Sequence, residues 1–261
     1  MIIDRIRMMV ASGGEIGETK VFHAPTGDIV FNQNPLIRRE VDAELEFMET
    51  WYETSSATTY GIYQGGYNNY KGTNYFGWSI SAAYGGLVYG AITVGDYRLP
   101  TKTEFEYLYS NSRTGSTYNG ISGAKWCGVE TDVIYSYKYF SSTKTVTMCG
   151  IIFFPDNQVI TGKTLTGVNN STASDIITTS ELNNLLKQGV LFMPGLGMYY
   201  PGSGWQGLGG SAYYWSSTNY DPDNTWYTNF YVKSGGRVSM GMKQDMPYDS
   251  APMAAIMCRG V

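Results

Sequence analysis

The sequence predicts an α+β protein, and three observations favour this fold class. Short β segments separated by glycine and Asp/Pro/Asn turns fill the C-terminal part of the chain, from Gly189 to Val261. Two other segments have the residue spacing of a helix-capping box. Glycine and tyrosine are abundant, at 32 and 23 residues, whereas charged residues make up 15% of the chain. This composition is typical of a protein rich in loops and β structure.

Length and charge restrict the classes of protein to which the chain can belong. The 261 residues are enough for one large domain or two small ones, with a substantial core. The formal net charge of −4 argues against a nucleic-acid partner, which would require a basic face. No apolar run approaches the length of a membrane span, so we expect no membrane insertion. The segment from Met1 to Gly17 lacks the apolar run and cleavage site of a signal peptide.

The N-terminal part is predicted to form an arm, a hairpin and a helix. Residues 1–20 resemble a flexible or partner-dependent arm, and Val21–Phe31 is expected to form a hairpin with its turn at Thr26-Gly27. A helix is expected to start at Asn34-Pro35 and end near Tyr52. Its apolar positions at helical spacing are Leu36, Ile37, Val41, Leu45 and Met48. We interpret residues 1–55 as an assembly segment that supports a homo-oligomer; an ordinary packing helix is the alternative.

Two capped helices and several strands are predicted farther along the chain. Ser55–Gly95, dense in Gly, Tyr, Asn and Ser, is expected to form long loops. Thr101 and Glu104 have capping-box spacing and predict a helix over 102–110. Strands are expected at 133–140, 145–154 and 158–160. Thr178 and Glu181 predict a second capped helix, over 180–188, which stops at Gly189.

These segments together resemble a known family. Arg98-Leu99-Pro100-Thr101, followed by Glu104-Phe105-Glu106, is similar to a helix motif of C-type lectin folds of the formylglycine-generating-enzyme type. Three later segments resemble the paralogous C-type-lectin-like domains of Fibrobacter, Bacteroidetes and their phages. They are Phe192-Met193-Pro194-Gly195, Tyr214-Trp215-Ser216-Ser217-Thr218 and Met257-Cys258-Arg259. The resemblance covers roughly Tyr60 to Val261, and residues 1–55 lie outside it.

The resemblance implies a C-type lectin fold over 56–261, with a twisted antiparallel β-sheet, two helices and long loops. The same fold carries the variable proteins of diversity-generating retroelements, in which a rigid scaffold displays randomised residues that bind a target. We therefore expect a non-enzymatic receptor-recognition protein on a virion or a bacterial cell surface, with a protein or glycan target. A structural virion subunit and a bacterial surface adhesin are the alternatives within this reading.

An enzyme of the formylglycine-generating type is the alternative from another class. Those enzymes act with a pair of cysteines near the C-terminal part of the fold, where this chain offers Cys258 alone. Cys127 and Cys149 are the two other cysteines, and all three have apolar neighbours that predict buried thiols. The single histidine, His23, excludes a site that needs two histidines. We expect no catalytic residues and no cofactor.

A bound metal ion has one candidate place. Asp221-Pro222-Asp223-Asn224 is rich in oxygen ligands, so Ca²⁺ is the ion to consider there, although such a sequence is more often a plain turn. The Glu-Pro-Asn or Gln-Pro-Asp loop of calcium-dependent lectins is absent from the sequence.

Strand alternation indicates a ligand-binding face on the last hairpin. If Trp226, Thr228, Phe230 and Val232 point inward, the intervening residues point outward. On the return strand, Val238, Met240 and Met242 are expected inward. The predicted ligand-binding residues are Tyr220, Asp223, Asn224, Tyr227, Asn229, Tyr231, Arg237 and Ser239. The alternative is that they are solvated sheet-edge residues. Trp215 and Trp226 are expected to be core residues.

Overall fold

The computed structural model describes residues 17–33, 37–41, 44–48, 74–75, 79–80, 93–94, 96–139, 142–169, 175–200, 204–207, 209–219, 224–232, 239–247 and 256–261. The helices are α2 (Lys102–Leu108) and α3 (Thr179–Lys187). The strands are β1 (Phe22–Ala24), β2 (Gly27–Phe31), β3 (Ile37–Val41), β4 (Glu44–Met48), β5 (Asn74–Tyr75), β6 (Ser79–Ile80), β7 (Thr93–Val94), β8 (Tyr97–Arg98), β9 (Ser116–Tyr118), β10 (Ile121–Ala124), β11 (Trp126–Tyr139), β12 (Ser142–Phe153), β13 (Val159–Ile160), β14 (Asp175–Ile177), β15 (Leu191–Pro194), β16 (Met198–Tyr200), β17 (Gly204–Gln206), β18 (Ser211–Asn219), β19 (Asn224–Tyr231), β20 (Ser239–Pro247) and β21 (Cys258–Gly260).

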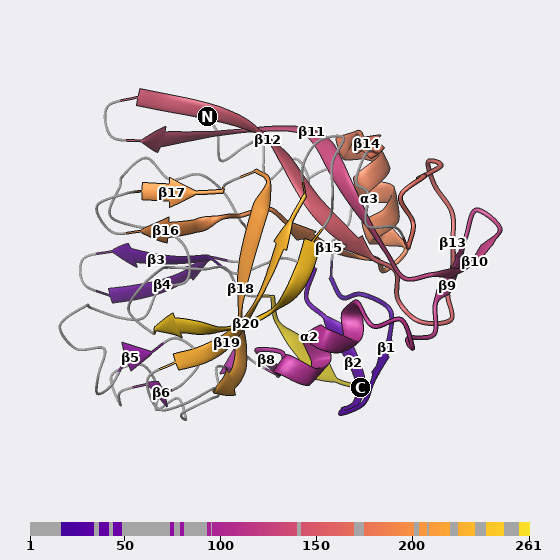
Figure 1. Ribbon diagram of the computed structural model, residues 1–261, viewed down its shortest axis with the longest axis horizontal. Helices are drawn as coiled ribbons and strands as arrows, with labels where there is room; N and C mark the ends of the chain where they lie inside the picture. The colour runs from indigo at the N-terminus through magenta and orange to yellow at the C-terminus, as the bar shows by residue number, and fades with distance from the viewer. Residues whose placement is uncertain are drawn as a thin grey trace.

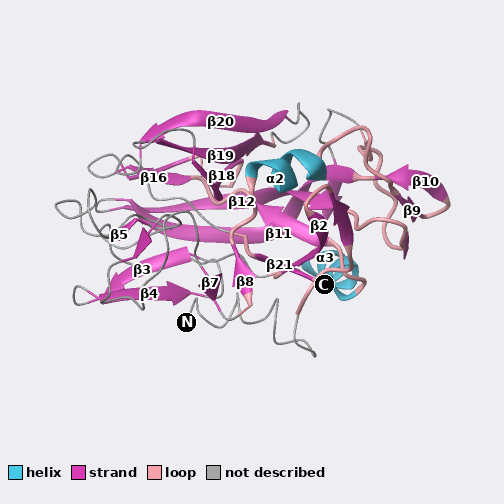
Figure 2. Ribbon diagram, turned by 90° about the horizontal axis from the view of Figure 1, so that it is seen from below, coloured by secondary structure: helices cyan, strands magenta, loops and turns pink. Residues whose placement is uncertain are grey.

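The strands form mainly antiparallel sheets with the two helices packed against them, so the fold class is α+β, as predicted (Figure 1). Figure 2 shows the β18-β19-β20 sheet along one side of the molecule and the long β11–β12 hairpin through its middle. β21 and β8 lie beyond that hairpin.

A four-stranded sheet in the order β14-β11-β12-β15 occupies the middle of the molecule. β11 and β12 pair antiparallel, from Trp126 opposite Phe153 to Tyr139 opposite Ser142. Residues 148–153 and 190–193 are buried along their whole length, as expected for apolar runs in a sheet covered on both faces. The predicted strands at 133–140, 145–154 and 158–160 are confirmed, and β11 starts earlier than predicted.

A second sheet, in the order β1-β2-β21-β8-β7, joins the two ends of the described chain. β21 lies between β2 and β8, with Cys258 opposite both Phe31 and Arg98. Glu18 also accepts hydrogen bonds from the Arg259 guanidinium and the Tyr97 hydroxyl. A terminal strand containing Met257 was expected inside the sheet; the observed strand starts one residue later, at Cys258, and does lie inside the sheet. Met257 itself is buried just before this strand, and residues 254–255 of the expected apolar run lie outside the described residues.

The N-terminal hairpin is confirmed, and it belongs to the core. Phe22 pairs with Ile29 and Ala24 with Gly27, so the turn is Pro25-Thr26, one residue earlier than predicted. The Phe22 and Phe31 rings pack edge to face, with centroids 5.3 Å apart, and both side chains are fully buried. The apolar residues of this hairpin are therefore part of the core rather than of a flexible arm. The assembly role of residues 1–55 stays a prediction.

The helix predicted to run from Asn34-Pro35 to Tyr52 is wrong. The described residues of this segment form the β3–β4 hairpin, in which Ile37 lies opposite Met48 and Val41 opposite Glu44. Leu45 and Phe47 alternate with glutamates, which is a period of two within a pattern that also fits a helix. In the backbone register of this hairpin, Arg39 lies opposite Glu46.

The two capped helices are confirmed. Glu104 N–H donates to Thr101 Oγ1 at 3.2 Å, and Thr101 N–H donates to Glu104 Oε2 at 2.7 Å. Thr178 and Glu181 form the same two bonds at the start of α3. α3 is followed by Gly189 at φ 87°, a left-handed conformation that favours glycine.

Both helices contribute to the hydrophobic core that also contains the C-terminal strands. α2 buries Phe105 and Leu108, and these residues belong to the same core as Tyr214 and Phe230. α3 adds Leu182, Leu185 and Leu186. Neither described helix has the length and apolar character that a membrane crossing requires.

Candidate functional site

The three-stranded sheet β18-β19-β20 carries the candidate site. Tyr213 lies opposite Asn229, which lies opposite Gly241, and Trp215 lies opposite Tyr227, which lies opposite Lys243. Because side chains alternate along a strand, this register sorts the residues into two faces. The inner face contains Ala212, Tyr214, Thr228, Phe230, Met240 and Met242. The outer face contains Ser211, Tyr213, Trp215, Tyr227, Asn229, Tyr231, Ser239, Gly241 and Lys243.

The inner face packs against the core, as predicted. Thr228, Phe230 and Val232 are buried, and Met240 and Met242 pack against the core while partly exposed. The Tyr214 ring stacks on Phe230 with centroids 6.3 Å apart, and its hydroxyl donates to the Pro194 carbonyl at 2.8 Å. These contacts fix the sheet to the core through its inner face and leave the outer face on the opposite side.

The outer face contains a cluster of three tyrosines, whose exposure increases from Tyr227 and Tyr213 to Tyr231. Tyr227 and Tyr213 are 6% and 7% exposed, whereas Tyr231 is 42% exposed. The Tyr213 and Tyr227 rings have centroids 6.1 Å apart, and the hydroxyls of Tyr213 and Tyr231 are separated by 3.2 Å. Beside Tyr231, Asn229 is half-buried and Ser239 is exposed. A single exposed aromatic ring is thus supported by two buried ones and bordered by polar residues.

The structure differs from the sequence prediction at one of the proposed contact residues. Tyr227 was expected to be free on the surface, but it is buried on the outer face beside Trp215. Trp215 is a fully buried core residue, as expected, yet it lies on the outer face. Period-2 alternation predicts on which face a residue lies, but it does not predict whether other parts of the chain cover that face.

The remaining predicted site residues have different outcomes. Asn229, Tyr231 and Ser239 lie together on the outer face. Asn224 is the first residue of β19, and only its backbone is described. Tyr220, Asp223 and Arg237 lie outside the described residues. Tyr213 was missed, although the adjacent pair Tyr213-Tyr214 in a strand must place one tyrosine on each face.

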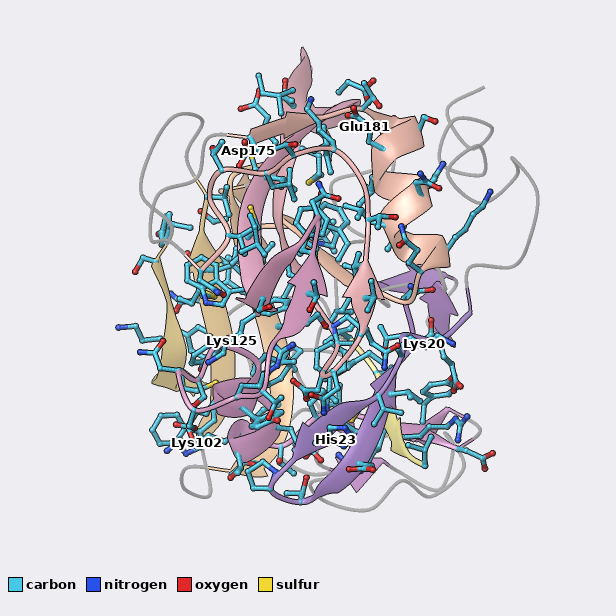
Figure 3. The ribbon with its side chains drawn as sticks, turned by 90° about the vertical axis from the view of Figure 1, so that its right-hand side faces the viewer. Lys20, His23, Lys102, Lys125, Asp175 and Glu181 are labelled. Carbon is cyan, nitrogen blue, oxygen red and sulfur yellow. The ribbon has the colours of Figure 1, made fainter. Side chains whose placement is uncertain are left out.

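Trp226 is only half-buried, in contrast to the fully inward position expected for it. The Lys102 ammonium group lies 3.7 Å from the Trp226 ring centroid, in a cation–π arrangement. Figure 3 shows Lys102 and His23 at one end of the molecule and Asp175 and Glu181 at the other.

A buried network around Glu104 connects α2 to β8 and to the turn of the N-terminal hairpin, and a neighbouring bond connects α2 to β18. Glu104 accepts bonds from Arg98 at 2.6 and 2.8 Å and from the Thr26 hydroxyl at 2.6 Å. Burial raises the pKa of this carboxyl, but the bonds from Arg98, Thr26 and Thr101 lower it below its usual value. On the other side, Lys102 N–H donates to Thr218 Oγ1 at 3.0 Å. The start of α2 is therefore fixed to β18.

No family model, curated protein or solved structure matches this chain. The family resemblance therefore rests on the sequence motifs, and the site is assigned from its own geometry.

The other buried ionic cluster is structural. Arg113 Nε donates to Asp156 Oδ1 at 2.9 Å, and both side chains are completely buried. Asp156 Oδ2 accepts from His23 N–H at 2.8 Å and from the Tyr107 hydroxyl at 3.1 Å. Burial, and then the charge of Asp156, raises the pKa of Tyr107 to about 12. These bonds join β1, α2 and the segments that follow α2 and β12, so they hold the N-terminal hairpin against the rest of the fold.

The three cysteines are buried free thiols, and their predicted burial is confirmed. Burial is the largest cause that raises the pKa of these thiols, and a nearby carboxylate adds to it: Asp175 for Cys127, Glu130 for Cys149 and Glu104 for Cys258. Together these causes raise the pKa of Cys127 to about 12, of Cys149 to about 11 and of Cys258 to about 12. A thiol with such a pKa is almost entirely protonated at neutral pH and is a poor nucleophile.

Metal ligation is a separate question. Within the described ranges, no three His, Cys, Asp or Glu side chains come together to hold a metal ion. Residues 221–223 of the candidate calcium turn lie outside those ranges.

Proposed function

We propose that this protein is a non-enzymatic recognition protein that binds its target through the exposed end of the outer face. Its scaffold is a C-type lectin fold that displays a variable surface, as in phage receptor-binding or retroelement-diversified proteins. The partner is a protein or glycan on a cell surface, and the protein acts on a virion or a bacterial surface.

The arrangement of Tyr213, Tyr227 and Tyr231 is the observation that carries this proposal. Tyrosine supplies a large amphipathic contact area and loses little rotamer entropy on binding, so it contributes strongly at interfaces. Asn229 and Ser239 beside it are short polar residues that adapt their hydrogen bonds to a partner. Because the rings of Tyr213 and Tyr227 are buried, Asn229 and Ser239 can be substituted while the fold persists.

The positions of the family motifs support the C-type lectin scaffold. Arg98 and Glu104 of the first motif form the ionic joint between β8 and α2. Tyr214 and Trp215 of the second motif are fully buried in β18, and the third motif leads into β21 inside the terminal sheet. Each motif thus occupies a place where a framework residue is needed.

The thiol chemistry of the chain weighs against the rival enzyme of the formylglycine-generating type. Such an enzyme needs reactive cysteines, whereas the three thiols here are buried and have raised pKa values. Incubation with a cysteine-containing peptide followed by mass spectrometry separates the two classes, because only the enzyme converts the peptide cysteine.

A display library tests the recognition proposal. Asn229, Tyr231 and Ser239 are randomised in the full chain displayed on yeast, and binders to hen egg-white lysozyme are selected as a model target. The control library randomises Ile121, Val159 and Ile176, three exposed strand positions on other sheets. We expect folded lysozyme binders from the first library and few from the second. Equal yields from both libraries, or general unfolding in the first, would contradict the proposal.

Retroelement diversification has its own test, at the level of the gene. The surrounding locus should contain a reverse transcriptase gene and a near-copy of the 3′ end that differs at adenines. A locus that lacks both would contradict retroelement diversification. The recognition proposal would still be decided by the display experiment.

A further inference from the structure

Tyr213 occupies a central place under the candidate site. It lies opposite Asn229, while Tyr231 lies opposite Ser211 and Tyr227 lies opposite Trp215. Tyr213 is therefore the diagonal neighbour of both of the other tyrosines on the outer face. Diagonal neighbours in a sheet are about 7–8 Å apart at the backbone, a separation that aromatic side chains bridge.

The contacts of Tyr213 match this position. Its ring packs at a tilt of 36° against the Tyr227 ring, and its hydroxyl lies 3.2 Å from that of Tyr231, within hydrogen-bonding distance. Either hydroxyl can donate, because each phenol offers one proton and can accept another. The buried ring of Tyr213 is thus a fixed point to which the half-exposed ring of Tyr231 is attached.

We propose that Tyr213 is a positioning residue for recognition, which holds the exposed Tyr231 ring in one orientation before a partner arrives. This inference rests on the proposed function, because it assigns Tyr231 as the contact residue. A side chain that is already ordered loses less conformational entropy on binding. Tyr213 itself is 7% exposed, so it acts through Tyr231 rather than by touching the partner.

The first test is a double-mutant cycle in a lysozyme binder in which Asn229 and Ser239 have been selected and Tyr231 is retained. Tyr213→Phe keeps the ring and removes the hydroxyl, and Tyr231→Phe removes the other half of the pair. We expect each single change to raise the lysozyme dissociation rate about fivefold, the effect of one typical hydrogen bond. The double change should be no worse than either single change. Fully additive effects, or no effect of Tyr213→Phe, would overturn the inference.

The second test needs no ligand and keeps the inference separate from the proposed function. Tyrosine rings are labelled with ¹³C in the unliganded full chain, and the order parameter of Tyr231 is measured by NMR. Tyr213→Phe should lower the order of the Tyr231 ring, whereas an unchanged order parameter would refute the positioning role. The matched control is Tyr214→Phe, which removes a hydroxyl on the inner face and should leave Tyr231 unchanged. If no lysozyme binder can be selected, the recognition proposal fails while this measurement still decides the role of Tyr213.

Discussion

Trp215 and Tyr231 lie on the same face of one sheet, four positions apart in cross-strand register, and differ in burial. Trp215 is completely buried, whereas Tyr231 has 42% of its surface exposed. The change from buried framework to the proposed contact surface therefore occurs along the sheet, rather than between its two faces. Substitutions along this one row of side chains should separate stability from binding.

The first prediction concerns that row. Trp215→Ala should lower the free energy of unfolding by about 3–5 kcal/mol, because it opens a cavity in a packed region. Tyr227→Ala should also destabilise the fold, by about 3 kcal/mol, since its ring is buried. Tyr231→Ala should change stability by less than about 0.5 kcal/mol, as is usual for surface residues. Urea denaturation measures all three, and a Tyr231→Ala variant that unfolds would show that its ring belongs to the core.

The second prediction concerns the pH dependence of stability at Glu104. The folded-state pKa of Glu104 lies below its usual value of 4.5, so its stabilising effect is present above that pH. The effect is lost as the pH falls through the folded-state pKa. Glu104→Gln should lower the free energy of unfolding by about 2 kcal/mol at pH 7, because Arg98 loses its charged partner. Arg98 remains partly exposed, so solvent limits this loss.

Urea denaturation from pH 7 to pH 3 checks this dependence. The difference in the free energy of unfolding between the native chain and Glu104→Gln should decrease as the pH falls. Glu106→Gln is the control, because Glu106 is an exposed residue of the same helix. The same difference in the free energy of unfolding at every pH would show that the Glu104 charge does not stabilise the fold.

At the scale of single elements, both helices begin with a capping box, and each box is attached to another part of the fold. Glu104 in the first box also bonds Thr26 and Arg98. Near the second box, Asp132 accepts bonds from the Thr179 N–H and hydroxyl, each at 2.7 Å. A helix start fixed in this way sets the orientation of the whole helix.

The third prediction is made at this scale. Thr178→Ala should lower the free energy of unfolding by about 1 kcal/mol, the usual contribution of a helix N-cap. Thr178→Ser retains the hydroxyl and should restore most of that loss. Thermal unfolding followed by circular dichroism compares the two variants, and equal melting temperatures for Ala and Ser would exclude a capping contribution.

The sequence predicts some of these elements well and others poorly, for physical reasons. Capping boxes are local chemistry, so Thr101 and Thr178 locate their helices to within two residues. The segment from Ile37 to Met48 satisfies helical and strand periods together, so periodicity alone does not decide between a helix and the β3–β4 hairpin. The sequence predicts the candidate site only in part. Alternation places Asn229, Tyr231 and Ser239 on one face, but the burial of Tyr227 depends on coverage that alternation does not encode.

At the scale of the whole molecule, the N-terminal hairpin and the C-terminal strand complete the same sheet. Phe22, Ile29 and Phe31 pack in the core, and β2 pairs with β21. Gln33 Nε2 also donates to the carbonyls of Leu186 and Val190, at 2.7 and 2.9 Å. The first described residues therefore support the helix and strand that precede the candidate site.

The fourth prediction follows from that arrangement. A chain that starts at residue 34 should fail to fold, because it loses β1, β2 and their buried phenylalanines. A chain that starts at residue 17 keeps every described contact and is the matched control. Circular dichroism and dispersion of the amide NMR signals measure folding. A well-folded chain lacking residues 1–33 would contradict this prediction and show that the segment is a separate arm.

The interior position of β21 has a consequence for how the protein folds. β21 follows the other described strands in sequence, yet it pairs with β2, which lies near the opposite end of the described residues. Pairing across such a long stretch of chain is slow, since distant residues must meet before the contact is formed. Until that pairing forms, β2 presents an unpaired strand edge, and such an edge is a template for aggregation. Removal of β21 would consequently leave both β2 and β8 with an unpaired edge.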